Sequence, residues 1–148
     1  MPHWVDAGFE EYARRMPREA RITLVEVKPH RRGAGAGDIL QALEMERRRI
    51  AAELPKDCYK VVLDERGEKL TTRELSGRMA EWRRSGRDVG FIIGGADGTA
   101  TALRSEADLL WSLSALTLPH QLVRIMLAEQ LYRAASMLGG HPYHREQA

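Results

Sequence analysis

The sequence has little cysteine and no long apolar run. Cys58 is the only cysteine among the 148 residues, so the chain can form no internal disulfide and has no cysteine pair for zinc. We expect Cys58 to be a small buried side chain. No apolar run approaches the roughly 20 residues needed to span a bilayer, and the start of the chain lacks the layout of a secretion signal. These absences favour a cytoplasmic protein.

A strong excess of one charge is also missing. The sequence has 23 Lys and Arg against 21 Asp and Glu, a net charge of +2, so any affinity for nucleic acid must come from local clusters. Basic residues do gather in three segments, which are 14–21, 28–32 and 47–49. Each segment could bind phosphate or could be an ordinary solvated face, and the sequence leaves both interpretations open.

Hydrophobic periodicity predicts helices that alternate with strands. The predicted helices are 5–16, 38–54, 71–86, 100–108 and 120–138, and the predicted strands are 21–27, 59–63, 89–93 and 109–113. Asp38 is expected to cap its helix, and Thr71 and Glu74 to form a capping box. Such alternation with short connections is typical of an α/β fold with a parallel sheet covered by helices on both faces. The length fits a single domain over 1–148.

Two further segments predict a basic loop and an interface with a partner chain. The segment 28–37 has three glycines and several basic groups, which predicts a mobile basic loop. The helix over 120–138 is apolar over more of its circumference than one core-facing stripe requires. We therefore expect its second face to be buried in a partner chain, as in a homodimer.

The segments after the last two predicted strands are the best candidates for a ligand site. Ligands of open parallel sheets bind beyond the carboxyl ends of the strands. The segment 94–98 has glycines that permit close backbone approach, although it matches neither G-x-G-x-x-G nor a P-loop and could be a plain tight turn. The segment 112–120 is too apolar for a surface loop, so we expect it to be covered and to form one wall of an adenine-sized pocket.

The end of the chain concentrates groups that suit RNA chemistry. After Gly139 and Gly140 come His141, Tyr143 and Arg145. A tyrosine can stack on a base, an arginine can pair with phosphate, and a histidine can accept a proton near neutral pH. The alternative is a frayed polar terminus.

These segments resemble the SPOUT superfamily of knotted methyltransferases, and within it the RlmH family, which methylates N3 of a pseudouridine in 23S ribosomal RNA. The residues that carry the resemblance run from one end of the chain to the other and are Met1–Val5 with Glu11 and Tyr12, Gly86–Val89, Ile93–Gly98, Trp111–His120, Leu131–Ala134 and His141–Glu146. The resemblance implies a trefoil knot over about 87–148, an exception to the rule that chains do not thread loops.

The resemblance also implies the cofactor, the partners and the site. S-adenosylmethionine would sit in the knot, and the implied contacts are Leu63, Gly95, Ser114, Ala115, Leu116, Thr117, Leu118 and Pro119. The target base would enter between two protomers, where His141, Tyr143 and Arg145 come from the opposite chain. His120 or a tail histidine is the candidate proton acceptor, and no metal is required. Contacts to phosphate are expected from Lys28, Arg31, Arg32, Arg133 and Arg145.

The sequence departs from the family at its start, and two alternative functions stay open. Family members begin with an apolar strand ahead of the segment that matches Met1–Trp4, so we expect the natural protein to start upstream of residue 1. The substrate would be 23S RNA within the large subunit or the assembled ribosome. The alternatives are a catalytically silent ribosome-binding protein of the same fold and a SPOUT methyltransferase with another RNA target. Apart from the resemblance, the residues support only an α/β nucleotide-type binder.

Overall fold

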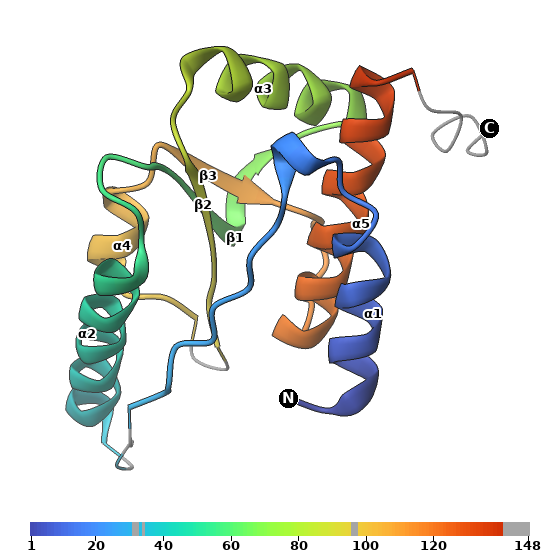
Figure 1. The fold of residues 1–148 in the computed structure, drawn as a ribbon. Coiled ribbons are helices and arrows are strands. Elements are labelled where there is room, and N and C mark those ends of the chain that lie inside the picture. The colour runs from blue at the N-terminus through green and yellow to red at the C-terminus, as the bar shows by residue number, and fades with distance from the viewer. Residues whose placement is uncertain (31–32, 34, 96–97, 141–148) are drawn as a thin grey trace.

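The computed structural model describes residues 1–30, 33, 35–95 and 98–140, and within them it has a parallel sheet between two layers of helices (Figure 1). The strands are β1 (Tyr59–Lys69), β2 (Val89–Ile93) and β3 (Leu109–Ser112), in the order β2-β1-β3. The helices are α1 (His3–Ala13), α2 (Ala36–Glu53), α3 (Thr72–Ser85), α4 (Thr101–Ser105) and α5 (His120–Leu138), with a 3-10 turn at Arg18–Ala20. The predicted α/β class is confirmed.

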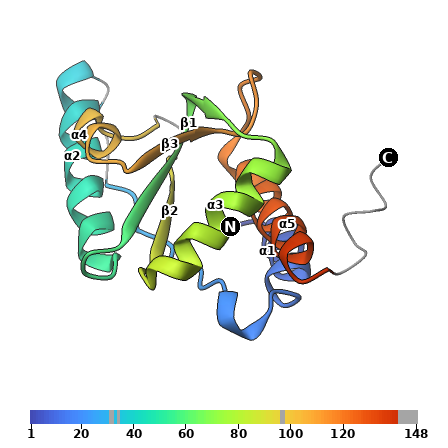
Figure 2. The same cartoon turned by 90° about the horizontal axis from the view of Figure 1, so that it is seen from above.

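Alternate residues of β1 fill the two halves of the core. Val61 and Leu63 point to the face covered by α3 and α5, where they pack with Leu75, Trp111 and Leu131. Val62 points to the other face, where its cluster includes Ile92, Leu103, Ile50 and Leu54. Figure 2 shows α2 and α4 on one side of the sheet and α3, α5 and α1 on the other. The prediction of helices on both faces is confirmed.

The bounds of α3 follow from its capping residues. The Thr71 hydroxyl accepts a hydrogen bond from the Glu74 amide at 3.0 Å, and the Glu74 carboxylate accepts one from the Thr71 amide at 2.9 Å. The bond from the Thr71 amide holds the pKa of Glu74 below its usual value. Gly86 ends the helix in the left-handed region, with φ of 71°. The predicted capping box is confirmed.

Several predicted boundaries are wrong. Gly35 is the N-cap residue of α2, without a side-chain cap, so the prediction that Asp38 caps this helix is wrong. Asp38 instead lies in the first turn, where a negative charge is favourable. β1 continues beyond Leu63 because it bends and pairs again with β3, Glu68 opposite Trp111. The predicted helix over 100–108 is shorter, Thr101–Ser105.

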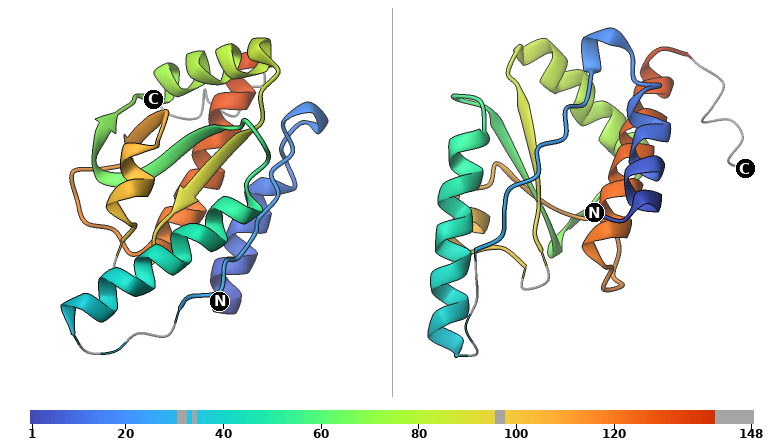
Figure 3. Two further views of the ribbon diagram at one scale, coloured as in Figure 1. Left: turned by 90° about the vertical axis from the view of Figure 1, so that its left-hand side faces the viewer. Right: turned by 60° about the horizontal axis from the view of Figure 1, so that its bottom comes forward.

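The largest error concerns the predicted strand 21–27. This segment pairs with no strand among the described residues, and Val25 is 50% exposed. It runs beside β2 in the same direction (Figures 1 and 3), and a groove of about 1040 Å³ is lined by both. A β-strand is stable only with a hydrogen-bonded neighbour, so the apolar composition of 21–27 produces an extended segment without a ladder.

Amide hydrogen exchange is expected to be faster in this segment than in the sheet. The amides of residues 22–27 should exchange with little protection, because no backbone hydrogen bond is found for them in the described chain. The amides of Val61 and Val62, in the central strand, should be protected most. Mass-spectrometric exchange resolved to peptides measures both, and equal protection of the two segments would contradict this description.

Candidate functional site

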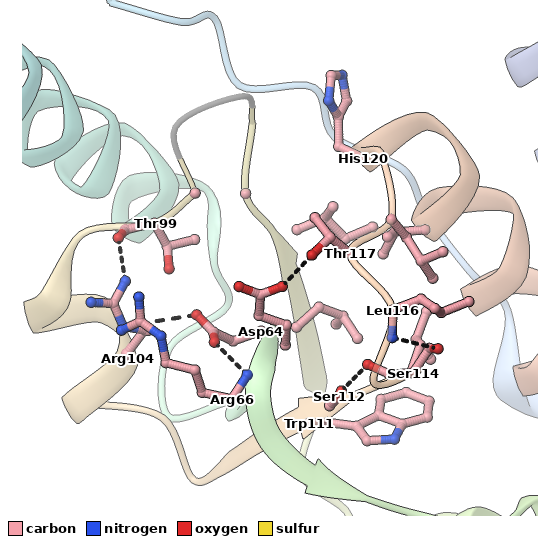
Figure 4. A pocket seen from close by; sticks show the side chains of 18 of the residues that line it. Asp64, Arg66, Thr99, Arg104, Trp111, Ser112, Ser114, Leu116, Thr117 and His120 are labelled. Atoms are coloured by element: carbon pink, nitrogen blue, oxygen red, sulfur yellow. Dashed lines mark hydrogen bonds and ion pairs between the residues drawn. The ribbon is translucent and has the colours of Figure 1, made fainter.

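A cavity of about 360 Å³ lies where the bend in β1 after Leu63 meets the carboxyl ends of β2 and β3 (Figure 4). Its walls come from this bend, the turn after β2 and the loop between β3 and α5. The described lining residues are Leu63–Arg66, Ile93–Gly95, Gly98, Thr99, Arg104, Trp111–Ser114, Leu116–Leu118, His120 and Val123. This is the edge at which parallel sheets bind ligands.

The turn after β2 forms one wall and depends on its glycines. A Cβ on Gly94 would lie 2.7 Å from the carbonyl carbon of Gly98, so the backbone can turn this tightly only with glycine there. The Gly98 amide donates to the Gly95 carbonyl at 3.0 Å, which closes the turn. Within the described residues, and apart from its chain neighbours, a Cβ on Gly95 would meet no atom within 4 Å. The backbone at Gly95 is therefore open to a ligand.

The loop after β3 forms the opposite wall. The Ser112 hydroxyl donates to the Ser114 carbonyl at 2.7 Å, and the Ser114 hydroxyl accepts from the Leu116 amide at 3.0 Å. In the described chain the amides of Thr117 and Leu118 have no hydrogen-bond partner, so they are available to a polar ligand edge. The expectation that this loop is covered is wrong for residues 115–117, which are exposed, with Leu116 at 70%.

Charged and polar side chains line the cavity beside the bend in β1. The Asp64 carboxylate accepts a hydrogen bond from the Arg66 amide at 2.8 Å and lies 3.8 Å from the Arg104 guanidinium. Arg104 also donates to the Thr99 carbonyl at 2.7 Å, so it links the bend in β1 to the turn after β2. The Thr117 hydroxyl donates to the Glu65 carboxylate at 2.9 Å, across the cavity (Figure 4).

One buried polar atom in this wall lacks a partner. Thr99 is 7% exposed, and its hydroxyl makes no hydrogen bond within the described residues. A buried hydroxyl without a partner costs about 1–3 kcal/mol, which a ligand group that bonds to it would recover. Together with the open backbone at Gly95, this hydroxyl suits a ligand rich in hydroxyl and ring nitrogen groups.

The structure brings together most of the residues that the sequence proposed for a cofactor. Of these, Leu63, Gly95, Ser114, Leu116, Thr117 and Leu118 line the cavity, and so does His120. Ala115 and Pro119 belong to the same loop but do not line it. Whether these residues bind a cofactor stays a prediction.

The residues proposed for RNA lie elsewhere or outside the described chain. Arg133 is on α5, about 20 Å along the helix from His120, and pairs with Glu129 at 2.8 Å. Lys28 is exposed at the end of the extended segment. Arg31, Arg32, His141, Tyr143 and Arg145 lie outside the residues that the structure describes.

Sequence reasoning missed the polar residues of the cavity. These are Asp64, Glu65, Arg66, Thr99 and Arg104. The signal was present for the first three, because they follow directly on the buried run that ends at Leu63, at the carboxyl end of a predicted strand. Thr99 and Arg104 could not be found from periodicity, because their contacts depend on how α4 packs.

The fold is of the α/β class with a cavity at the edge of its parallel sheet, and comparison with known families identifies the class of protein. The chain belongs to the family described as Predicted SPOUT methyltransferase, whose model matches residues 1–144. It is therefore a methyltransferase, and the general methyl donor of this family is S-adenosylmethionine.

Similar proteins come from several bacteria, and each is named Ribosomal RNA large subunit methyltransferase H. The protein of Nitrosospira multiformis is 57% identical over 145 residues, which cover 98% of this chain and 92% of that protein. The protein of Laribacter hongkongensis is 51% identical over 146 residues, covering 99% and 93%. That of Burkholderia mallei is 55% identical over 146 residues, covering 98% and 92%. The predicted resemblance is confirmed.

No helix is long and apolar enough to cross a membrane among the residues that the structure describes. The same residues contain no group of three or more His, Cys, Asp or Glu side chains arranged to hold a metal ion. Cys58 is buried, as expected.

Proposed function

We propose that this chain transfers a methyl group from S-adenosylmethionine to N3 of a pseudouridine in 23S ribosomal RNA. The observation that carries the proposal is the cavity, because the turn after β2 and the loop after β3 form its two walls in a chain that matches the family over 1–144. The name of the relatives supports a target in the large ribosomal subunit. The proposal includes one domain over 1–148 with a trefoil knot over about 87–148.

The residues of the cavity fit the proposed cofactor. The amides of Thr117 and Leu118 suit the edge of adenine, and the Thr99 hydroxyl and the open backbone at Gly95 suit polar groups of the ligand. Leu63, Leu116 and Leu118 supply apolar surface. S-adenosylmethionine, when bound, supplies a methyl group on a positively charged sulfur. The remaining tasks of the protein are to align the base and to accept its imide proton.

His120 is the proposed proton acceptor among the described residues, because it lines the cavity and its neutral ring can act as a base. We expect His120→Ala to lower the single-turnover rate by about 100-fold or more, with little change in cofactor affinity. The same assay on His141→Ala tests the alternative base in the tail. An unchanged rate for His120→Ala would exclude it from proton transfer.

The proposed homodimer would use the outer surface of α1 and α5. Leu122 and Met126 are exposed one turn apart on α5, and Trp4 is exposed on α1. Exposed apolar side chains that lie together mark interfaces. In this dimer the tail residues His141, Tyr143 and Arg145 of one protomer would meet the cofactor of the other.

Charge on this surface is expected to separate the protomers. The double variant Leu122→Glu, Met126→Glu should run as a monomer in size-exclusion chromatography with light scattering, because burying two carboxylates in an interface is unfavourable. Leu40→Glu, on the exposed face of α2, is the matched control and should leave the mass unchanged. A double variant with the same mass as the unmodified dimer would place the interface elsewhere.

Transfer of labelled methyl groups to ribosomes tests the proposed reaction. The chain is expected to methylate assembled ribosomes or large subunits from a strain that lacks this activity, with mass mapping of the modified nucleotide to a pseudouridine. Cofactor binding without any transfer would favour the silent ribosome-binding protein, and modification of another nucleotide would favour a different RNA target. Loss of transfer at high salt would support phosphate contacts from Lys28, Arg31, Arg32, Arg133 and Arg145. The reaction would take place in the cytoplasm, with the ribosomes.

A further inference from the structure

The charges around the cavity influence how well it distinguishes the methyl donor, S-adenosylmethionine, from its product, S-adenosylhomocysteine. The inference rests on the proposed function, in which a positively charged sulfonium is converted to a neutral thioether. An uncharged site has no electrostatic preference for the sulfonium over the thioether. A nearby carboxylate attracts the positive charge and therefore favours the sulfonium. Among the residues that the structure describes, the titratable side chains that line the cavity are Asp64, Glu65, Arg66, Arg104 and His120.

Asp64 is already compensated by the protein. Its carboxylate lies 3.8 Å from the Arg104 guanidinium and accepts the Arg66 amide at 2.8 Å. Its side chain is only 13% exposed, so the pair is held within the wall. The charge of Asp64 is therefore largely balanced by Arg104 before any ligand binds.

The Glu65 carboxylate, unlike that of Asp64, has a neutral hydrogen-bond partner. Its hydrogen-bond partner is the hydroxyl of Thr117, at 2.9 Å, and no cationic side chain pairs with it within the described residues. A hydroxyl satisfies one lone pair of a carboxylate but leaves its negative charge uncompensated. The bond also holds Glu65 over the cavity, because Thr117 lies in the loop that forms the opposite wall (Figure 4).

We propose that Glu65 is a specificity-determining residue that makes the cavity favour the charged sulfonium over the neutral thioether, with Thr117 as its positioning residue. The carboxylate adds attraction for the positive charge of the donor and loses that attraction when the methyl group leaves. Release of the product is then assisted by the reaction itself. Arg66 lines the same cavity and opposes this attraction, so the net effect should be moderate.

Calorimetric titration with three ligands tests the proposal. The ligands are S-adenosylmethionine, its product S-adenosylhomocysteine, and sinefungin, in which an amine-bearing carbon replaces the sulfonium. Glu65→Gln keeps the size of the side chain and an oxygen for Thr117 but removes the charge. We expect this variant to bind both charged ligands about fivefold more weakly, equivalent to about 1 kcal/mol, and to bind the thioether with an affinity changed by less than about twofold.

Two further variants separate charge from structure. Thr117→Val keeps the Glu65 carboxylate but removes the hydrogen bond that positions it. It should therefore weaken the two charged ligands by a smaller factor than Glu65→Gln does, and change the affinity for the thioether by less than about twofold. Glu68→Gln, on the same strand but outside the cavity and paired with Arg78, is the matched control and should change none of them.

The outcomes separate this inference from the proposed function. If Glu65→Gln lowers the affinities for all three ligands equally, or changes none of them, the proposed role of Glu65 is overturned. The cofactor site itself is then unaffected. An unmodified chain that binds none of the three ligands overturns the proposed cofactor, and this inference with it.

Discussion

Replacing Gly94 by alanine should reduce the affinity for S-adenosylmethionine by about tenfold or more. The added Cβ would lie 2.7 Å from the carbonyl carbon and 2.8 Å from the carbonyl oxygen of Gly98. These are backbone atoms of the turn that forms one wall of the cavity, so they cannot move aside without reshaping that wall. Overpacking of this kind costs about 1–3 kcal/mol, and 1.4 kcal/mol corresponds to a factor of ten.

Gly95→Ala is the matched control for the turn. A Cβ on Gly95 meets no atom within 4 Å in the part of the chain that the structure describes, so this variant should keep the melting temperature of the unmodified chain. Any loss of affinity in Gly95→Ala then reports contact between the new methyl group and the ligand. Calorimetric titration and thermal unfolding of both variants give these quantities, and normal cofactor binding by Gly94→Ala would contradict the geometry of the turn.

Replacing Gly67 by alanine should lower the free energy of unfolding by about 1–3 kcal/mol. Gly67 lies where β1 bends and pairs a second time with β3. A Cβ there would lie 2.5 Å from the carbonyl carbon and oxygen of Leu110 and from the amide nitrogen of Trp111. The clash would force β1 and β3 apart next to the cavity, so cofactor affinity should fall as well.

Gly77→Ala provides the comparison for Gly67→Ala. Gly77 lies inside α3, and a Cβ there would meet nothing within 4 Å. Alanine is favoured over glycine in a helix, so this variant should raise the free energy of unfolding by about 0.5–1 kcal/mol. Urea titration followed by circular dichroism measures both changes. Equal effects of the two substitutions would mean that β1 does not approach β3 as closely as described.

The elements with clear periodicity could be predicted from the sequence. The helix α5 has the predicted bounds, His120–Leu138, and β2 has the predicted bounds, Val89–Ile93. The box formed by Thr71 and Glu74 is local, so three residues of spacing were enough to find it. The two walls of the cavity could be located because parallel strands place their carboxyl ends together.

The remainder depends on contacts between distant parts of the chain. The apolar composition of 21–27 predicts a strand, but a strand also needs a neighbour, which a local pattern does not reveal. The second pairing of β1 with β3 depends on the close approach at Gly67, which periodicity does not encode. The hydrogen bond between Glu65 and Thr117 joins residues 52 positions apart, so it can be identified only from the folded structure.

The most direct test of the account is a crystal structure of this chain with S-adenosylmethionine. We expect density for the adenosyl group between the turn at Gly94–Gly98 and the loop 112–118, with the sulfur on the side of Glu65. Density for the cofactor at any other place, or a structure in which the turn and the loop do not face one cavity, would contradict it.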